Sequence, residues 1–144
     1  MHIKFLLAIF LLFVQTQPAS DKWECRGDSQ PLPKEQLTRL TSRELRERVV
    51  VCAVPRLPGD FDGQGTVVVE VQVDEFGVLR CARSLRDDEH PIMRRAALDA
   101  VKQWRFKPVL ADGKAKPFFG ILGVVVSRDT AKSGEQCPKE KRQN

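Results

Sequence analysis

The sequence predicts an α+β fold. A small antiparallel three-stranded sheet carries an amphipathic helix on one face, and a second helix lies nearer the N-terminus. Three observations predict it. The stretch from Thr66 to Val73 alternates like a strand, the stretch from Pro91 follows a helical period, and glycine-containing turns separate the apolar segments. The expected order of elements is helix, strand, strand, helix, strand.

The segment from Pro91 to Pro108 is expected to be the helix on which the rest of the fold is organised. Pro91 suits the first helical position, because its missing N–H would have no helical partner there. Pro108 cannot continue a helix, so the chain must turn. Leu98 lies on the flank. The predicted buried face repeats every three to four residues and consists of Met93, Ala96, Ala97, Ala100, Val101 and Trp104.

Two strands are expected to form a hairpin before this helix, and a third strand follows it. In the first, Thr66 to Val73, alternate valines face the helix, whereas Thr66, Val68, Glu70 and Gln72 point away. The turn Asp74–Gly77 leads into Val78 to Leu85, with a bulge near Arg80–Cys81. After a turn at Ala111–Lys114, the last strand runs from Lys116 to Val126 and is apolar on both faces.

The N-terminal part divides into a leader and an extension. Residues 1–20 are expected to be a signal peptide, with Lys4, an apolar run from Phe5 to Val14, and small residues before a cut at Asp21. Residues 21–54 are expected to be a loop and helix extension. Its helix would span Lys34 to Arg48, or a shorter segment capped by Thr41 or Ser42. Val49–Val54 fits a buried strand or a helix end equally well.

The apolar run near the N-terminus has about a dozen residues, and a membrane-spanning helix needs about 20. We therefore expect a soluble protein in the periplasm or outside the cell, with an uncleaved inner-membrane anchor as the alternative. Removing residues 1–20 leaves about 124 residues, which suits one small domain. The core domain is expected at 55–126, followed by a mobile tail at 127–144.

Four cysteines, Cys25, Cys52, Cys81 and Cys137, are disulfide candidates in an exported chain. Three pairings are possible, and we favour Cys25 with Cys137 and Cys52 with Cys81. Zinc would need ligand pairs two to four residues apart, which the spacing does not provide. We therefore expect no metal.

No pattern of residues indicates catalysis. His90 is the one histidine after the leader, and it follows a run of acidic residues in a polar link, with no nucleophile beside it. The cysteines form no Cys-x-x-Cys pair. The net charge of +5 is mild, and no basic run with interleaved aromatic residues suggests nucleic acid. We expect neither an enzyme nor a cofactor.

Several motifs carry a family resemblance. They are Gly65-x-Val67-x-Val69-x-Val71-x-Val73-Asp74-Glu75-x-Gly77, then Ala96-Ala97-Leu98-x-Ala100-Val101-x-x-Trp104-x-Phe106-Lys107-Pro108, then Asp112-Gly113-Lys114, with Pro55-Arg56-Leu57-Pro58 upstream. Together they resemble the C-terminal domain of TonB-like energy transducers. The resemblance implies a periplasmic domain that grasps a short peptide of an outer-membrane transporter and transmits force to it.

In this family the peptide pairs with the edge of the strand that follows the helix. The resemblance therefore implies docking along Phe118 to Val126, and Arg105 and Lys107 would complement an acidic partner. The predicted partner-binding residues are Phe118, Phe119, Ile121, Leu122, Val124 and Val126 on this strand, and, from their positive charge near the helix end, Arg105 and Lys107. A full transducer also has an uncleaved membrane helix and a proline-rich spacer, which this sequence does not show. We therefore expect a binding module that is associated with transmembrane transport but does not transmit force to its partner. The alternative is a disulfide-stapled secreted scaffold or a homodimer. Contact with a membrane is expected only if the leader is retained.

Overall fold

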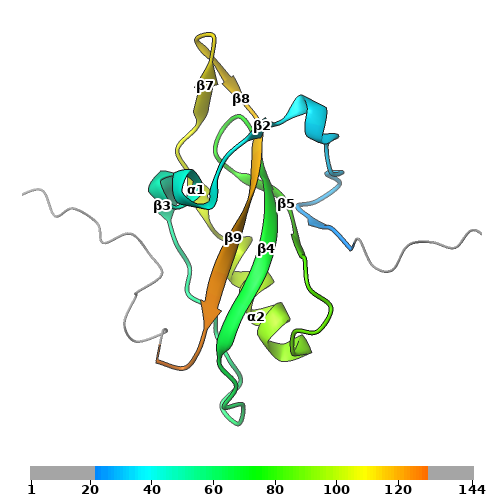
Figure 1. Ribbon diagram of the computed structural model, residues 1–144, viewed down its shortest axis with the longest axis vertical. Helices are drawn as coiled ribbons and strands as arrows, with labels where there is room; N and C mark the ends of the chain where they lie inside the picture. Colours follow the sequence, from blue (N-terminus) through cyan, green and yellow to red (C-terminus); the bar gives the residue numbers. More distant parts are fainter. Residues whose placement is uncertain (1–21, 130–144) are drawn as a thin grey trace, which may run out of the picture.

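A five-stranded sheet, in the order β1-β5-β4-β9-β2, forms the centre of the computed structural model, which describes residues 22–129. Its three inner strands are β5 (Leu79–Ser84), β4 (Gly65–Val73) and β9 (Phe118–Val126). These three pair antiparallel, and β4 and β9 pair along their full lengths (Figure 1). The inner strands are the three that the sequence predicts.

The sheet is wider than predicted, because a short strand is added at each edge. β1 (Glu24–Cys25) pairs antiparallel with β5, and β2 (Thr38–Arg39) pairs parallel with β9. Both come from the N-terminal extension, for which the sequence predicts a loop and a helix. Strands of two residues carry no periodicity, so sequence patterning misses them.

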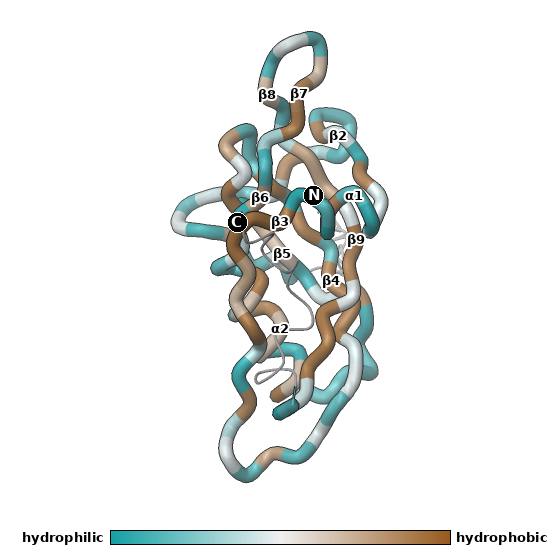
Figure 2. The backbone as a smooth tube through the Cα atoms, turned by 90° about the vertical axis from the view of Figure 1, so that its left-hand side faces the viewer, coloured by the Kyte–Doolittle hydropathy of each residue, from teal (hydrophilic) through white to brown (hydrophobic). Residues whose placement is uncertain are grey.

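One face of the sheet packs on the helix α2 (Pro91–Val101) and forms the core. Val67, Val69, Val71 and Val73 are fully buried there, as their alternation predicts. From α2, Ala96, Ala97, Ala100 and Val101 are buried against them, and Leu98 on the flank is buried as well. Figure 2 shows hydrophobic stretches along β4 and β9, whereas the turns at the end opposite β7 (Val109–Ala111) and β8 (Lys114–Lys116) are mostly hydrophilic.

The predicted helix from Pro91 to Pro108 is too long. α2 ends at Val101, Trp104 lies beyond it, and Arg105–Phe106 forms the strand β6. β6 pairs with β3 (Val49–Val51), and the Phe106 N–H donates to the Gly77 carbonyl at 2.9 Å. These tertiary hydrogen bonds replace those of another helical turn. Trp104 is still buried, and its Nε1 donates to the Ala53 carbonyl at 2.8 Å.

Two predicted turns have the backbone that their glycines suggest. Gly77 has a φ of 80°, and a Cβ there would lie 1.9 Å from the Phe106 carbonyl oxygen, so no other residue fits. The bulge expected near Arg80 is present as a register shift between β4 and β5. Asp112 and Gly113 have φ values of 52° and 74° and join β7 (Val109–Ala111) to β8 (Lys114–Lys116).

Residues 22–48 form an N-terminal arm around the sheet. After β1 the arm contains the 3-10 turn η1 (Lys34–Gln36), β2 and the helix α1 (Ser42–Arg48). A helix over Lys34–Arg48 is therefore wrong. The shorter alternative is confirmed, since Thr41 caps α1 and forms a capping box with Glu44. In Figure 1 the blue-to-cyan arm passes from the β5 side of the sheet to the β9 side.

A disulfide joins Cys25 of β1 to Cys81 of β5, and the two residues are direct partners in the strand register. The pairing of Cys25 with Cys137 and of Cys52 with Cys81 is therefore wrong. The physical reason is that β1 lies on the β5 edge, which brings these two Cα atoms to 4.0 Å. Cys52 is also disulfide-bonded. Cys137, residues 1–20, for which a signal peptide is predicted, and most of the tail lie outside the described residues.

Candidate partner-binding edge

The strand expected to bind a partner, β9, buries most of its side chains. Phe118, Leu122, Val124 and Val126 face the helix side of the sheet and are at most 1 % exposed. They therefore hold β9 in place and leave its backbone as the part that a partner strand could meet. Ile121, on the other face, is 39 % exposed.

The backbone of β9 directs alternate residues toward β4 and toward the outer edge. The carbonyls of Pro117, Phe119, Ile121 and Gly123 point outward, since each accepts a hydrogen bond from residues outside the β4–β9 pair. Leu122 lies between two of them and therefore directs its N–H and carbonyl toward β4. The odd-numbered residues thus form the edge at which another strand could add.

Residues 38–46 of the same chain cover this edge, and we call them the cap. The N–H groups of Thr38 and Leu40 donate to the Pro117 and Phe119 carbonyls at 3.0 and 2.9 Å. The Ser42 hydroxyl donates to the Ile121 carbonyl, and an Arg46 Nη donates to the Gly123 carbonyl at 3.2 Å. All four outward carbonyls from Pro117 to Gly123 are therefore satisfied within the chain.

Two leucines anchor the cap in the core. Leu45 of α1 is fully buried and Leu40 is 8 % exposed, and both belong to the core cluster. Gly120 leaves the space that Leu45 fills, because a Cβ on Gly120 would lie 2.5 Å from Leu45 Cδ1. The cap is thus built on a glycine of the strand that it covers.

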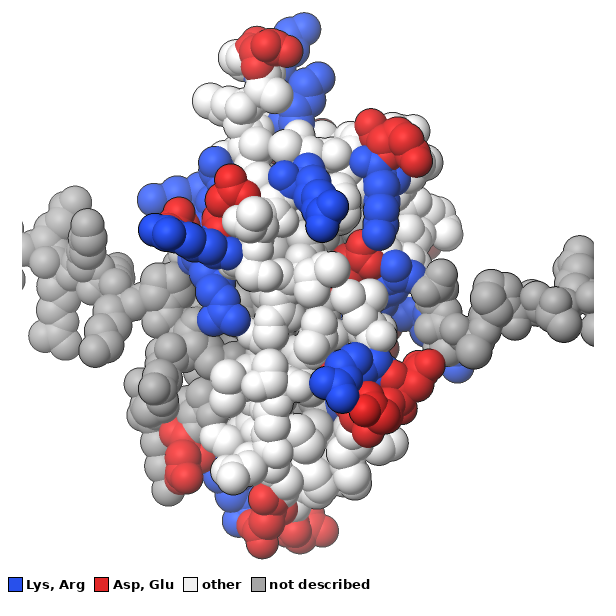
Figure 3. Space-filling view, viewed as in Figure 1, with Lys and Arg blue, Asp and Glu red and all other residues white. Residues whose placement is uncertain are grey.

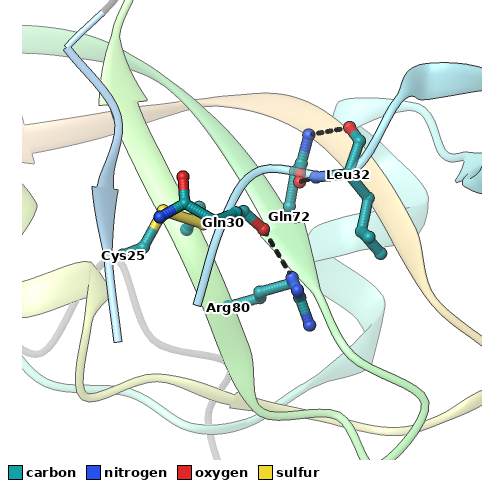
Figure 4. The surroundings of a disulfide bond; sticks show 6 residues. Cys25, Gln30, Leu32, Gln72 and Arg80 are labelled. Atoms are coloured by element: carbon teal, nitrogen blue, oxygen red, sulfur yellow. Dashed lines mark hydrogen bonds between the residues drawn. A yellow bond between two sulfur atoms is a disulfide. The ribbon is translucent and has the colours of Figure 1, made fainter. Parts of the chain in front are cut away.

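Between β1 and the cap, the arm crosses the sheet face opposite α2. The sequence predicts that Glu70 and Gln72 point away from the buried face, and both are nevertheless only 1 % exposed. Gln72 makes two hydrogen bonds with the backbone of Leu32, at 2.8 and 3.0 Å (Figure 4). Glu70 is ion-paired with Arg83 at 2.6 Å and with Lys34 of the arm at 2.9 Å.

The first residues of the arm are tied to β5 and α2. Next to the Cys25–Cys81 disulfide, Glu24 forms ion pairs with Arg95 and Lys102 of the α2 region. Partial burial raises the pKa of Glu24, but the hydrogen bonds from Lys102 and Arg95 outweigh this effect and lower its pKa overall. The same contact with Glu24 raises the pKa of Arg95.

Arg105 and Lys107 do not lie on the β9 edge. Arg105 is on β6, the Lys107 N–H donates to the Arg48 carbonyl at 2.7 Å, and both side chains are exposed beside β3. The cap residues, which do lie on the edge, were missed by sequence reasoning. A signal was present in Leu40 and Leu45, because apolar residues spaced along a charged segment indicate a face that packs on a core.

Neither a metal site nor a membrane-spanning helix is formed by the described residues. Within residues 22–129, no group of three or more His, Cys, Asp or Glu could hold a metal, and no helix is long and apolar enough to cross a bilayer. His90 caps α2, accepting from the Ile92 N–H at 3.2 Å, and packs against Phe61.

Comparison with known proteins relates the central part of the chain to a family. Residues 62–121 match the family model of the Gram-negative bacterial TonB protein C-terminal. The match spans β4, β5, α2, β6, β7, β8 and the first part of β9, and it leaves out the whole N-terminal arm. No curated protein matches the chain. Domains of this family are periplasmic in bacteria and bind proteins. Residues 62–121, which make up less than half of the chain, are thus TonB C-terminal domain-like, and this likeness implies a TonB-like role in transport-related protein interaction.

Proposed function

We propose that this chain is a periplasmic module that recognises an extended peptide segment by strand addition to β9. The candidate partner is a segment of a TonB-dependent outer-membrane transporter. In this proposal the partner strand takes the place of the cap along Pro117–Gly123 and continues toward Val126.

The pairing of β2 with β9 supports this proposal most directly. A segment of the chain itself already adds to this edge as a parallel strand, with Thr38 and Leu40 as donors. The edge therefore has the geometry that strand addition requires. β2 has only two residues, so a longer partner strand could make more hydrogen bonds than β2 does.

Release of the cap costs free energy, because Leu40 and Leu45 leave the core. Burial of each leucine is worth about 1.5 to 3 kcal/mol, so opening costs about 3 to 6 kcal/mol. At 1.4 kcal/mol per factor of ten, roughly one molecule in 10² to 10⁴ is open. The apparent affinity for a partner is reduced by the same factor. Weak binding by the wild-type chain, and stronger binding after the cap is loosened, is therefore expected.

The test compares two double variants of α1. Ser42→Ala/Arg46→Ala removes two hydrogen bonds to β9 and leaves Leu45 in place. Arg43→Ala/Glu47→Ala is the matched control, because these exposed residues form an ion pair with each other. Synthetic peptides copied from the N-terminal segments of TonB-dependent transporters of the same bacterium serve as probes. At about 0.5 to 1.5 kcal/mol per hydrogen bond, the first variant should bind about tenfold more tightly than wild type.

The control variant should bind these peptides as wild type does. Ile121→Pro should abolish binding in every background, since it removes an outward N–H without touching the ladder to β4. Ile121→Ala keeps this N–H and is its control. Equal affinities for wild type, both double variants and Ile121→Pro would rule out docking at this edge.

A second function is supported by a specific observation. Short strands of the chain itself close both edges of the sheet, β1 on β5 and β2 on β9. A disulfide-stapled scaffold, or a homodimer that uses other surfaces, requires closed edges of this kind. Absence of peptide binding even in Ser42→Ala/Arg46→Ala would favour the scaffold, and sedimentation over a range of concentrations would separate monomer from dimer.

A further inference from the structure

One end of the molecule combines the most exposed apolar side chains with the excess of positive charge. Among the described residues, the four most exposed large hydrophobic side chains are Phe76 (75 %), Leu110 (68 %), Val50 (60 %) and Val51 (51 %). Monomeric proteins rarely gather such groups at one place unless the place binds something.

Hydrogen bonds show that these four residues belong to adjoining elements. β6 pairs with β3, which carries Val50 and Val51. On its other side β6 contacts the 74–77 turn, through the Phe106 N–H to the Gly77 carbonyl. β7, which carries Leu110, follows three residues after Phe106. Figure 1 shows the β7–β8 hairpin projecting beyond the sheet at one end of the long axis, and β3 and β7 are hydrophobic stretches in Figure 2.

The positive charge is concentrated in the same region. Residues 34–48 and 105–116 carry nine lysines and arginines against four aspartates and glutamates, a net charge of +5. The other residues between 22 and 129 carry ten against twelve, a net charge of −2. The two basic segments adjoin, because Lys107 and Arg48 are hydrogen-bonded through their backbones. Figure 3 shows Lys and Arg over the hairpin and beside α1 and β2, above a broad uncharged area over β4 and β9.

The β7–β8 hairpin carries both an exposed apolar side chain and positive charge. Leu110 and Ala115 are cross-strand partners and share one face, while Val109, on the opposite face, is buried. The face with Leu110 therefore points away from the core. Three exposed lysines surround this face, namely Lys107, Lys114 and Lys116. None of them forms an ion pair within the described part of the chain. A projecting hairpin that exposes Leu110 on one face among unpaired lysines matches a lipid surface, where Leu110 enters the headgroup layer and the lysines meet phosphates.

We propose that this end, made of the β7–β8 hairpin, β3 and the 74–77 turn, docks on an anionic phospholipid surface. Acidic residues in these elements would be repelled by an anionic surface. Asp74 is paired with Arg26 at 3.3 Å, so Glu75 and Asp112 remain to oppose the docking. The proposed docking elements contain no residue of β9 or of the cap, so variants of the hairpin test this inference separately from peptide binding at β9.

Co-sedimentation of the full chain with vesicles tests this proposal. The vesicles contain phosphatidylcholine alone or phosphatidylcholine with phosphatidylglycerol. Because the apolar run of residues 5–14 could attach the chain to either vesicle, the readout is the difference between the two lipids and between variants. Wild type should prefer the anionic vesicles, and salt should weaken this preference.

Matched variants locate the binding surface. Each lysine near an anionic surface contributes about fivefold in affinity, so Lys114→Gln/Lys116→Gln should lose about 25-fold. Lys22→Gln/Arg56→Gln removes the same charge elsewhere and should lose much less. Leu110→Ser should weaken binding, whereas Ile92→Ser, an exposed aliphatic residue on α2, should not. Asp112→Asn should strengthen binding, and asparagine tolerates the positive φ at this position.

Equal binding to both vesicle types, or equal losses in the hairpin and control variants, would overturn the proposal. A soluble acidic peptide, polyglutamate, that displaces the chain from vesicles at the same charge concentration would also overturn it. That result would point to an acidic protein partner.

Discussion

The backbone N–H of Leu40 donates a hydrogen bond to the carbonyl of Phe119 at 2.9 Å. Through this contact the N-terminal arm acts as a strand on the outer edge of β9. Leu40 lies outside the segment that matches the TonB C-terminal family, whereas Phe119 lies within it. The N-terminal arm, which the family model does not cover, thus lies on the outer edge of β9. The family resemblance implies a partner at this same edge.

The contact between Gly120 and Leu45 should be sensitive to one added methyl group. Gly120→Ala would place a Cβ 2.5 Å from Leu45 Cδ1 and 2.7 Å from the Leu40 carbonyl oxygen. Overpacking of this kind costs about 1 to 3 kcal/mol. Urea unfolding should show this loss. Combining Gly120→Ala with Leu45→Val should cost less than the sum of the single changes, and strict additivity would mean that α1 does not pack on Gly120.

The carboxylate of Glu70 should contribute strongly to stability, because it is buried and forms ion pairs with Arg83 and with Lys34. Glu70→Gln removes the carboxylate charge that pairs with the mostly buried Arg83 at 2.6 Å, and breaking a buried ion pair of this kind costs about 3 kcal/mol or more. Lys34→Gln is the control and should cost less than about 1 kcal/mol, because the Lys34 side chain is 55 % exposed. Equal, small losses in both variants would contradict burial of Glu70 under the arm.

The Cys25–Cys81 disulfide should stabilise the fold by restricting the unfolded chain. The bond joins residues 56 positions apart, for which the chain-entropy account gives about 4 kcal/mol and measured cases usually give about 2 to 4 kcal/mol. Cys25→Ser/Cys81→Ser should lower the free energy of unfolding in this range. Peptide mapping without reductant should recover Cys25 and Cys81 in one linked fragment, and recovery of Cys25 linked to Cys137 would refute the arrangement.

Stability should fall in acid partly through Glu24. The pKa of this residue is lowered from its ordinary value of 4.5, so its ion pairs stabilise the fold above that pH. This stabilisation should be lost as the pH falls below 4.5 through the lowered pKa. Unfolding of wild type and Glu24→Gln by urea at several pH values checks the sign. The difference in free energy of unfolding between wild type and Glu24→Gln should become smaller as the pH falls. A difference that grows would contradict a lowered pKa of Glu24.

Sequence reasoning recovered the parts of the fold that have long periodic patterns. The valines of β4 and the alanines of α2 each repeat over two or more turns or alternations, so the core and its helix were predictable. The bulge near Arg80 and the turn at Gly77 were predictable from local chemistry. β1 and β2 were not, because two residues form no pattern and their pairing depends on where the arm crosses the sheet.

The candidate site was only partly predictable for the same reason. The resemblance pointed to an open edge at β9, whereas the structure places β9 inside the sheet with β2 along its outer side. Glu70 and Gln72 appeared solvent-facing because their side chains are polar, and only the tertiary contacts with Lys34 and Leu32 show why they are buried. The cap depends on residues that contact β9 across about 80 positions of sequence, as Ser42 does with Ile121. Local patterns contain no information about such contacts.

Hydrogen exchange of the full chain, with and without a transporter-derived peptide, tests the central claim most directly. If a partner strand replaces the cap, the peptide should increase protection of the Ile121 and Gly123 amides. The same peptide should decrease protection of the α1 amides, because residues 38–46 must leave the edge. A peptide that binds while α1 keeps its full protection would contradict strand addition at β9.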